Sequence, residues 1–408
     1  MTRGFATILA AQFCSALADN ALLFAAIALL RDLRAPSWQT PVLQVFFVFS
    51  YIVLAPFVGP LADALPKGRV MFVSNGVKIL GCVAMLLGMH PLPAYAVVGV
   101  GAAMYSPAKY GILTEYLPHQ KLVWANGWME GLTVAAIIIG AVLGSFLVGS
   151  RYIDFAAAFF ATLKHRGWVA SDPAYAMLAL LGIYLAAAVI NLYIPRTAPD
   201  HKLPRKTPLY ILHDFWHSLS LLWRDPLGQV SLAVTTLFWG ASASLRLMLL
   251  EWAHPALGLK LAQATQLTAV TGVGVVLGSV LAARLIALHR SVKVLPTGIF
   301  MGLGVMAIAG ITDVRLAVLL ILVLGAMGGF FLVPMNALLQ HRGHLLMGAG
   351  HSIAVQNFNE NVSILVMSGA YAAMDRGGMP IHAIIICFGV FVAATMFYLW
   401  RKHGHDQD

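Results

Sequence analysis

The chain has 408 residues, of which 60% are hydrophobic and 10% charged, and its mean hydropathy is +0.82. A soluble domain carries about 25% charged residues, and a water-soluble fold of this length could not bury so much apolar surface, so the composition excludes a soluble protein. The net charge of +10 would suggest a nucleic-acid partner on a soluble chain, but most Lys and Arg lie between apolar segments, as membrane anchoring requires. We therefore expect no nucleic-acid partner.

A spanning helix needs about 20 mostly apolar residues, and segments of this kind fill almost the whole chain. The expected spans are 5–30, 41–63, 69–89, 94–115, 122–149, 174–194, 228–252, 264–288, 294–312, 315–339, 347–374 and 379–400. The first span is too long for a signal peptide and carries Asp19 and Asn20 in its middle, so we interpret it as uncleaved. The sequence thus predicts an all-α integral membrane protein with twelve transmembrane helices.

The longest polar stretch, 195–226, divides the chain almost at its centre. Its Pro, Lys and Arg content predicts a cytoplasmic linker between an N-terminal six-helix bundle, 1–194, and a C-terminal six-helix bundle, 227–408. The halves also resemble each other, because the fourth span of each carries a Gly and a Pro at the same spacing, in 101–107 and in 328–334. Internal repeats of this kind are typical of secondary transporters, whose substrate sites lie near the midplane between the halves.

Lys and Arg predict the orientation, because cytoplasmic loops are enriched in both. With a cytoplasmic N-terminus, the inside loops would hold fifteen: Arg3, Lys67, Arg69, Lys121, Arg196, Lys202, Arg205, Lys206, Arg224, Arg284, Arg290, Lys293, Arg342, Arg401 and Lys402. The outside loops would hold eight: Arg31, Arg34, Arg151, Lys164, Arg166, Lys260, Arg315 and Arg376. We therefore expect both termini to be cytoplasmic.

Ionisable groups inside the spans are the first functional candidates, because an Asp, Lys or Arg at a helix centre costs at least about 2.5–3.5 kcal/mol. These groups are Asp19, Lys78, Lys109, Glu130, Arg246 and Glu360. Helical spacing places most of them in polar stripes, which are Gln12, Ser15 and Asp19; Asn126, Glu130 and Thr133; Trp239, Ser242 and Arg246; and Ser352, Gln356, Glu360 and Ser363. Each stripe should face the protein interior or a water-filled cavity, because lipid would not tolerate it.

A structural role competes with a functional one at each position. Glu130 and Glu360 could simply hold helix pairs together, and Lys78 could snorkel or pair with Asp63. For Asp19 and Arg246 a functional role is favoured, because they lie on the first spans of the two halves, and those spans usually line the central cavity. The mixed signs suit either a substrate with a phosphate and an amine, or internal ion pairs, and the sequence leaves both open.

The loop that follows the second span, Gly59–Arg69, resembles the signature loop between spans two and three of the major facilitator superfamily. It predicts a conformational latch made of Gly59, Asp63, Lys67 and Arg69. The sequence has no Walker A loop, so we do not expect ATP-driven transport, and no His or Cys constellation predicts a metal site or a cofactor.

Several stretches resemble the bacterial lysophospholipid transporter family of that superfamily. They are 16–23, 55–59, 101–111, 125–130, 237–240 with 245–246, 328–339, and 353–357 with 360–361. The run Tyr105–Gly111 is the most specific of them. The resemblance implies a flippase that moves lysophospholipids, chiefly lysophosphatidylethanolamine, from the outer to the inner leaflet of the bacterial inner membrane without ATP. It also implies reacylation by a separate cytoplasmic acyltransferase/acyl-carrier-protein synthetase, and the superfamily usually works as monomers.

The family's polar headgroup contacts match Asp19, Lys109 and Arg246. The full set of expected substrate-binding residues is Asp19, Asn20, Tyr105, Lys109, Glu130, Trp239, Arg246, Gln356, Asn357 and Glu360. Two departures are a longer outer segment at 154–172 and His351, where the family pattern suggests Asn. The alternatives are a proton-coupled exporter of amphipathic molecules and a membrane-embedded enzyme or non-catalytic partner in lipid acylation.

Overall fold

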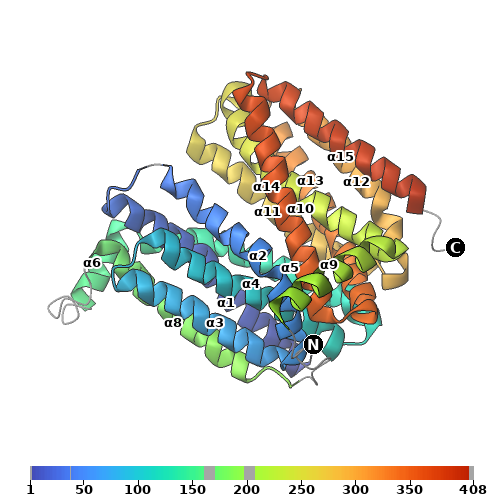
Figure 1. The fold of residues 1–408 in the computed structure, drawn as a ribbon. Helices are drawn as coiled ribbons and strands as arrows, with labels where there is room; N and C mark the ends of the chain where they lie inside the picture. The colour runs from blue at the N-terminus through green and yellow to red at the C-terminus, as the bar shows by residue number, and fades with distance from the viewer. Residues whose placement is uncertain (1, 37, 160–170, 197–206, 404–408) are drawn as a thin grey trace. The chain divides into compact units, whose positions relative to one another are not determined.

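The computed structural model describes residues 2–36, 38–159, 171–196 and 207–403, and the ordered elements within these ranges are helices (Figure 1). The chain divides by its contacts into two compact units, Met1–Ile112 with Ala136–Leu212, and Leu113–Ala135 with His213–Asp408. The predicted outer segment 154–172 and the predicted linker 195–226 lie partly outside the described residues. Five of the loop cations counted above lie wholly outside them: Lys164, Arg166, Lys202, Arg205 and Lys206.

The first unit is built from helices of the first half of the chain. They are α1 (Arg3–Asp32), α2 (Gln39–Ala64), α3 (Lys67–Leu86), most of α4 (Pro91–Tyr116), the second half of α5 (Leu122–Leu147), α6 (Ser150–Phe159) and α8 (Asp172–Leu192). Its core forms where α8 packs against both α1 and α3.

The second unit contains the first half of α5, most of α9 (Pro208–Arg224) and the remaining helices. These are α10 (Pro226–Leu257), α11 (Leu261–Leu285), α12 (Leu295–Ile308), α13 (Val314–Leu346), α14 (Ala349–Arg376) and α15 (Ile381–His403). Two short 3-10 helices, His119–Lys121 and Leu288–Val294, precede α5 and α12. The closest packing joins α11 to α13, α12 to α15 and α10 to α14.

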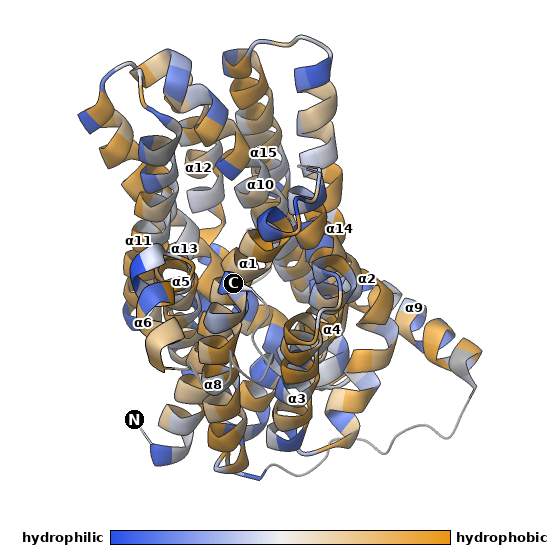
Figure 2. Ribbon diagram, turned by 90° about the vertical axis from the view of Figure 1, so that its left-hand side faces the viewer, coloured by the Kyte–Doolittle hydropathy of each residue, from blue (hydrophilic) through white to orange (hydrophobic). Residues whose placement is uncertain are grey.

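The helices confirm the twelve predicted spans. Ten helices in the described ranges are long and apolar enough to cross a membrane. The other two expected spans are α4 and α14, which have 26 and 28 residues, enough for a crossing, but carry more polar residues. Figure 2 shows hydrophobic residues along most helices and hydrophilic residues gathered mainly near their ends.

The predicted repeat has a counterpart in the packing of each unit. The first and third spans pack against the sixth in the first unit, as α1 and α3 against α8. In the second unit α10 and α12 pack against α15 in the same way. The matching prolines, Pro107 and Pro334, both lie inside the fourth-span helix of their half.

Small residues allow the tightest of these contacts. A Cβ built at Gly278 of α11 would lie 1.8 Å from the carbonyl oxygen of Ala326 in α13, and one at Gly329 would lie 2.1 Å from that of Val275. Only glycine permits backbones to approach so closely, which is the usual way helices associate in membranes.

The chain between the two halves contains the helix α9, which the sequence analysis did not anticipate. Phe215 of α9 makes an edge-to-face contact with Phe358 of α14, with ring centroids 5.3 Å apart. Asp214 lies 3.4 Å from Nε2 of His351, the residue that departs from the expected family pattern. The part of 195–226 that the structure describes is therefore largely a packed helix.

Candidate functional site

The first unit surrounds Asp19 of α1 with donors from two other helices, α3 and α8. Nζ of Lys78 on α3 lies 2.6 Å from Oδ2 of Asp19, and the hydroxyl of Tyr184 on α8 donates to Oδ1 at 2.8 Å. Lys78 is 1% exposed and Asp19 16%. Both carboxylate oxygens of Asp19 therefore have charged or polar partners inside the helix bundle.

The ion pair extends along the polar stripe of α1. Lys78 also donates to Oγ of Ser15 at 2.9 Å, and Ser15 donates to Oδ1 of Asn75 at 2.7 Å. The Lys78 ammonium lies 4.7 Å from the centre of the Tyr105 ring, close enough for a cation–π interaction. Lys78 pairs with Asp19, so the predicted alternative partner, Asp63, was wrong.

Gly101 explains how α4 fits against this cluster. A Cβ at Gly101 would lie 2.6 Å from Cγ of Lys78 and 2.7 Å from the carbonyl oxygen of Ser74. The first glycine of the repeated motif thus makes room for the Lys78 stem, and the helix then carries Tyr105 over the ammonium.

Two other candidates of the first unit lie in different surroundings. Lys109 is buried, and its Nζ lies 4.5 Å from the centre of the Tyr110 ring. Asn20 donates to the backbone oxygen of Ala16 and packs near Gly140, where an added Cβ would lie 2.8 Å from Cβ of Asn20.

The second unit joins two buried carboxylates through two amides. Asn336 on α13 donates to Glu130 on α5 at 3.0 Å. Gln356 on α14 donates to Oδ1 of Asn336 at 2.8 Å and to Glu360 at 2.7 Å. Glu130, Asn336, Gln356 and Glu360 are each at most 8% exposed. We call this chain of four side chains the amide bridge.

A reciprocal amide pair lies on the same two helices, α5 and α13. The side-chain nitrogen of Asn126 donates to Gln340, and that of Gln340 donates back to Asn126, both at 2.8 Å. Gly127 lets this part of α5 approach α11, because a Cβ there would lie 2.5 Å from Cβ of Ala283. These bonds help place the first half of α5 in the second unit.

The stripe on α10 differs from the others, because it is not buried. Arg246 is exposed, while Trp239 and Ser242 are half-buried. Trp239 makes an edge-to-face contact with Phe238, at 5.7 Å between ring centroids.

The remaining candidate, Asn357, follows Gln356 on α14 and is 8% exposed.

The signature loop forms a local ion pair. Nζ of Lys67 lies 3.1 Å from Oδ1 of Asp63 and donates to the backbone oxygen of Ala62 at 2.6 Å. Both side chains are at most 1% exposed, whereas Arg69 is exposed. Lys67, which the sequence analysis counted among the cytoplasmic-loop cations, is therefore buried.

The start of α10 carries a further ion pair, between Asp225 and Arg342. Arg342 contacts both carboxylate oxygens of Asp225, with Nε 3.0 Å from Oδ2, and the backbone N–H of Gly228 donates to Oδ2 at 2.8 Å. Burial raises the pKa of Asp225, but the hydrogen bonds from Arg342 and Gly228, with the Arg342 charge, outweigh it and hold the pKa below its ordinary value. Asp225 thereby also caps α10.

Sequence reasoning missed several of these residues. Asn336 and Gln340 were not among the candidates, and neither was Tyr184. Asn336 follows Pro334 by two residues in the repeated motif, so its position carried a signal. Tyr184 stands in an apolar run and had none.

Comparison with known proteins assigns the chain to a family. The sequence profile described as Major Facilitator Superfamily matches residues 8–368. "Lysophospholipid transporter LplT" of Klebsiella pneumoniae (strain 342) is 43% identical over 402 residues, covering 98% of this chain and 96% of its own. The protein of the same name from Serratia proteamaculans (strain 568) is also 43% identical, with the same coverage.

Solved structures resemble the chain in fold. A transporter described as FucP, in the outward conformation, superposes with a TM-score of 0.76 at 16% identity, covering 98% of this chain and 99% of its own. The human organic anion transporter MFSD10 (TETRAN) superposes with a TM-score of 0.74 at 14% identity, covering 98% and 100%. The matched proteins are transporters, so an enzymatic role is not supported.

Proposed function

Because the chain belongs to the major facilitator superfamily and, within it, to the lysophospholipid transporter family, we propose that it moves lysophospholipids across a membrane by alternating access. The transport runs from the outer to the inner leaflet of the bacterial inner membrane, without ATP, and lysophosphatidylethanolamine is the chief substrate. The observation that carries this proposal is the 43% identity to lysophospholipid transporters over nearly the whole of both chains.

The headgroup contacts form the next part of the proposal. A lysophospholipid presents a phosphate, which suits Arg246 and Lys109 through charge-assisted hydrogen bonds. An ammonium suits a carboxylate such as Asp19, Glu130 or Glu360, with Gln356, Asn357 and Asn20 as neighbours. Asp19 is already engaged by Lys78 and Tyr184, so an ammonium would have to displace one of them during the cycle.

The domain organisation and orientation that we propose rest on the sequence pattern, and the partner enzyme is the one that the family resemblance implies. We propose that 1–194 and 227–408 act as the two moving halves, that 195–226 joins them, and that both termini are cytoplasmic. Gly59, Asp63, Lys67 and Arg69 would form the latch between conformations. The protein would act as a monomer and supply its product to a separate cytoplasmic acyltransferase/acyl-carrier-protein synthetase.

A flipping assay in liposomes tests the proposal. The purified protein should accelerate movement of labelled lysophosphatidylethanolamine between leaflets, and no acceleration over protein-free vesicles would contradict the function. Arg246→Ala should slow flipping, because the phosphate loses a cation, whereas Arg376→Ala, another exposed arginine, should leave it unchanged.

The amide bridge favours one other candidate, a proton-coupled exporter of amphipathic molecules. Glu130 and Glu360 are buried carboxylates that could exchange protons during a cycle. Repeating the assay with and without an imposed pH gradient separates the two functions, because an exporter of this kind would depend strictly on the gradient.

A further inference from the structure

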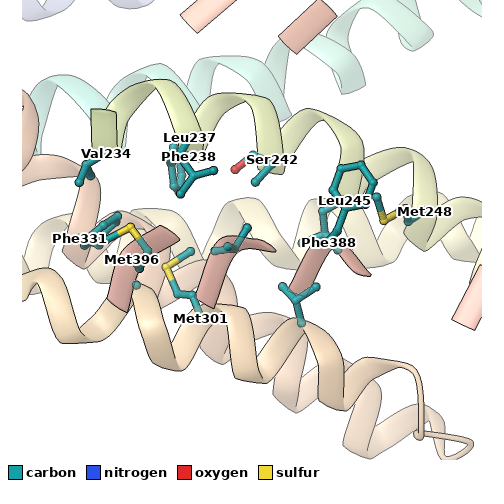
Figure 3. A pocket seen from close by; sticks show the side chains of 14 residues that line it. Val234, Leu237, Phe238, Ser242, Leu245, Met248, Met301, Phe331, Phe388 and Met396 are labelled. Atoms are coloured by element: carbon teal, nitrogen blue, oxygen red, sulfur yellow. The ribbon is translucent and has the colours of Figure 1, made fainter. Parts of the chain in front are cut away.

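An apolar cavity of about 60 Å³ lies inside the second unit, between α10, α12, α13 and α15 (Figure 3). Its lining is hydrophobic except for Ser242. Seven of its lining residues lie along one face of α10: Val234, Leu237, Phe238, Ala241, Ser242, Leu245 and Met248. Apart from Ser242 of the α10 stripe, no residue of the polar clusters described above lines this cavity, so it suits a ligand group of different chemistry.

The residues that line the cavity extend along α10 over the length of a lipid chain. Val234 and Met248 are fourteen residues apart on α10, which at a rise of about 1.5 Å per residue corresponds to about 21 Å. One leaflet of a bilayer, half of a hydrocarbon core of about 30 Å, accommodates an acyl chain in about 15 Å. The face of α10 that lines the cavity is therefore long enough for an extended acyl chain.

The lining can also yield to a chain. Three methionines, Met248, Met301 and Met396, come from three different helices around the cavity. Methionine is unbranched and polarisable, so it adapts to ligands of irregular shape. The free space of about 60 Å³ is small, so an acyl chain would enter only as these flexible side chains change rotamer.

One end of the cavity is adjacent to a cation. Leu245 and Met248 line this end, and Arg246 stands between them in the sequence, four residues after the lining residue Ser242. Arg246 is exposed and belongs to the proposed phosphate site. A phosphate at Arg246 would thus leave a hydrocarbon tail beside this end of the apolar space.

The opposite end is narrow at Gly298. A Cβ built there would lie 2.8 Å from Cε of Met396, 2.9 Å from its Cγ, and 3.1 Å from Cζ of Phe331. Figure 3 shows Met396 and Phe331 near Val234, away from Leu245 and Met248. A single added methyl group at residue 298 would therefore occupy the far end of the cavity.

We propose that this cavity holds the single acyl chain of the substrate, and that Gly298, Met396 and Phe331 set the longest chain that is transported. The inference rests on the proposed function, because it takes the substrate to be a lysophospholipid. It adds a residue-level determinant of chain length, separate from the headgroup contacts.

Flipping rates for lauroyl, myristoyl, palmitoyl and stearoyl lysophosphatidylethanolamine test the proposal. Gly298→Ala and Gly298→Val should lower the stearoyl-to-lauroyl rate ratio by about fourfold for each methylene excluded, equivalent to about 0.8 kcal/mol. Met396→Ala should shift the ratio the other way, because it lengthens the cavity. Gly304→Ala is the matched control, since a Cβ at this α12 residue meets only the Leu324 side chain and Gly304 does not line the cavity.

The outcomes separate the two proposals. Failure of the wild-type protein to flip any of the four lipids would contradict the function itself. Wild-type flipping with an unchanged ratio in both Gly298 variants and in Met396→Ala would overturn the inference alone. Should a variant fold poorly, a lysolipid with a photoreactive group at its acyl terminus should label Met396 or Phe331 in the wild-type protein, and labelling confined to other helices would equally overturn it.

Discussion

Asp19, in the first unit, meets a cation, whereas Glu130 and Glu360, in the second, accept hydrogen bonds from neutral amides in the amide bridge. The Asp19–Lys78 pair gains Coulomb energy that grows as water is excluded, and it depends on both charges being present. An amide can donate to a carboxylate or accept from a carboxylic acid, so the amide bridge accommodates either protonation state. The free-energy cost of burying a carboxylate inside a membrane is thus offset by a fixed ion pair in one unit and by an adaptable hydrogen-bond chain in the other.

The largest effect should come from breaking the ion pair on one side. Lys78→Met leaves Asp19 charged and inside the bundle without its cation, which should lower the free energy of unfolding by about 3–5 kcal/mol. Unfolding in detergent micelles or bicelles measures this loss. The double variant with Asp19→Asn should recover much of it, and a double variant as unstable as the single one would show that packing by the Lys78 stem, rather than charge, dominates.

Interrupting the amide bridge should lower the free energy of unfolding by less. Asn336→Leu removes the donor to Glu130 and the acceptor for Gln356, leaving buried polar groups unsatisfied at about 1–3 kcal/mol. Chemical or thermal unfolding against wild type measures the change. A loss as large as that of Lys78→Met would contradict the distinction between the two units.

The smallest effect should come from the partly exposed pair between Asp225 and Arg342. Asp225→Asn keeps a good helix cap but removes the charge, so stability near neutral pH should fall by no more than about 1 kcal/mol. Because the pKa of Asp225 is lowered in the folded protein, its contribution is complete above the unfolded pKa of about 3.9 and is lost as pH falls through the folded pKa. Unfolding measured across acidic pH should therefore show a shallower acid loss in Asp225→Asn, and equal acid profiles would exclude this pair as a source of the pH dependence.

The fold was predictable because solvent dictates it. Twelve apolar runs can only be helices in a bilayer, and their ends were placed within a few residues of the observed ones, although α10 and α13 extend further than expected. The helix α9 was overlooked within a polar stretch, although Leu212, Phe215 and Leu222 follow helical spacing there.

The site was less predictable. Helical spacing shows which residues share one face of a helix, but it does not show which other helix packs against that face. The stripes correctly indicated that Ser15, Glu130, Gln356 and Glu360 are shielded from lipid. Which group each of them meets depends on how helices far apart in sequence pack. For this reason Asp63, which is closer along the chain, was offered as one possible partner of Lys78, whereas the structure pairs Lys78 with Asp19.

The contact between Gly101 and the stem of Lys78 has a consequence for the divergence of related genes. A side chain at position 101 would collide with the lysine, so the two positions cannot drift independently. A Cβ there would also lie 2.7 Å from the carbonyl oxygen of Ser74. Among descendants of a common ancestor, replacement of this glycine should therefore be found only where α4 has shifted away from α3 and position 78 has become shorter, and position 19 should then have lost its negative charge. The order of those three substitutions along a phylogeny would reveal whether the ion pair was inherited as a unit.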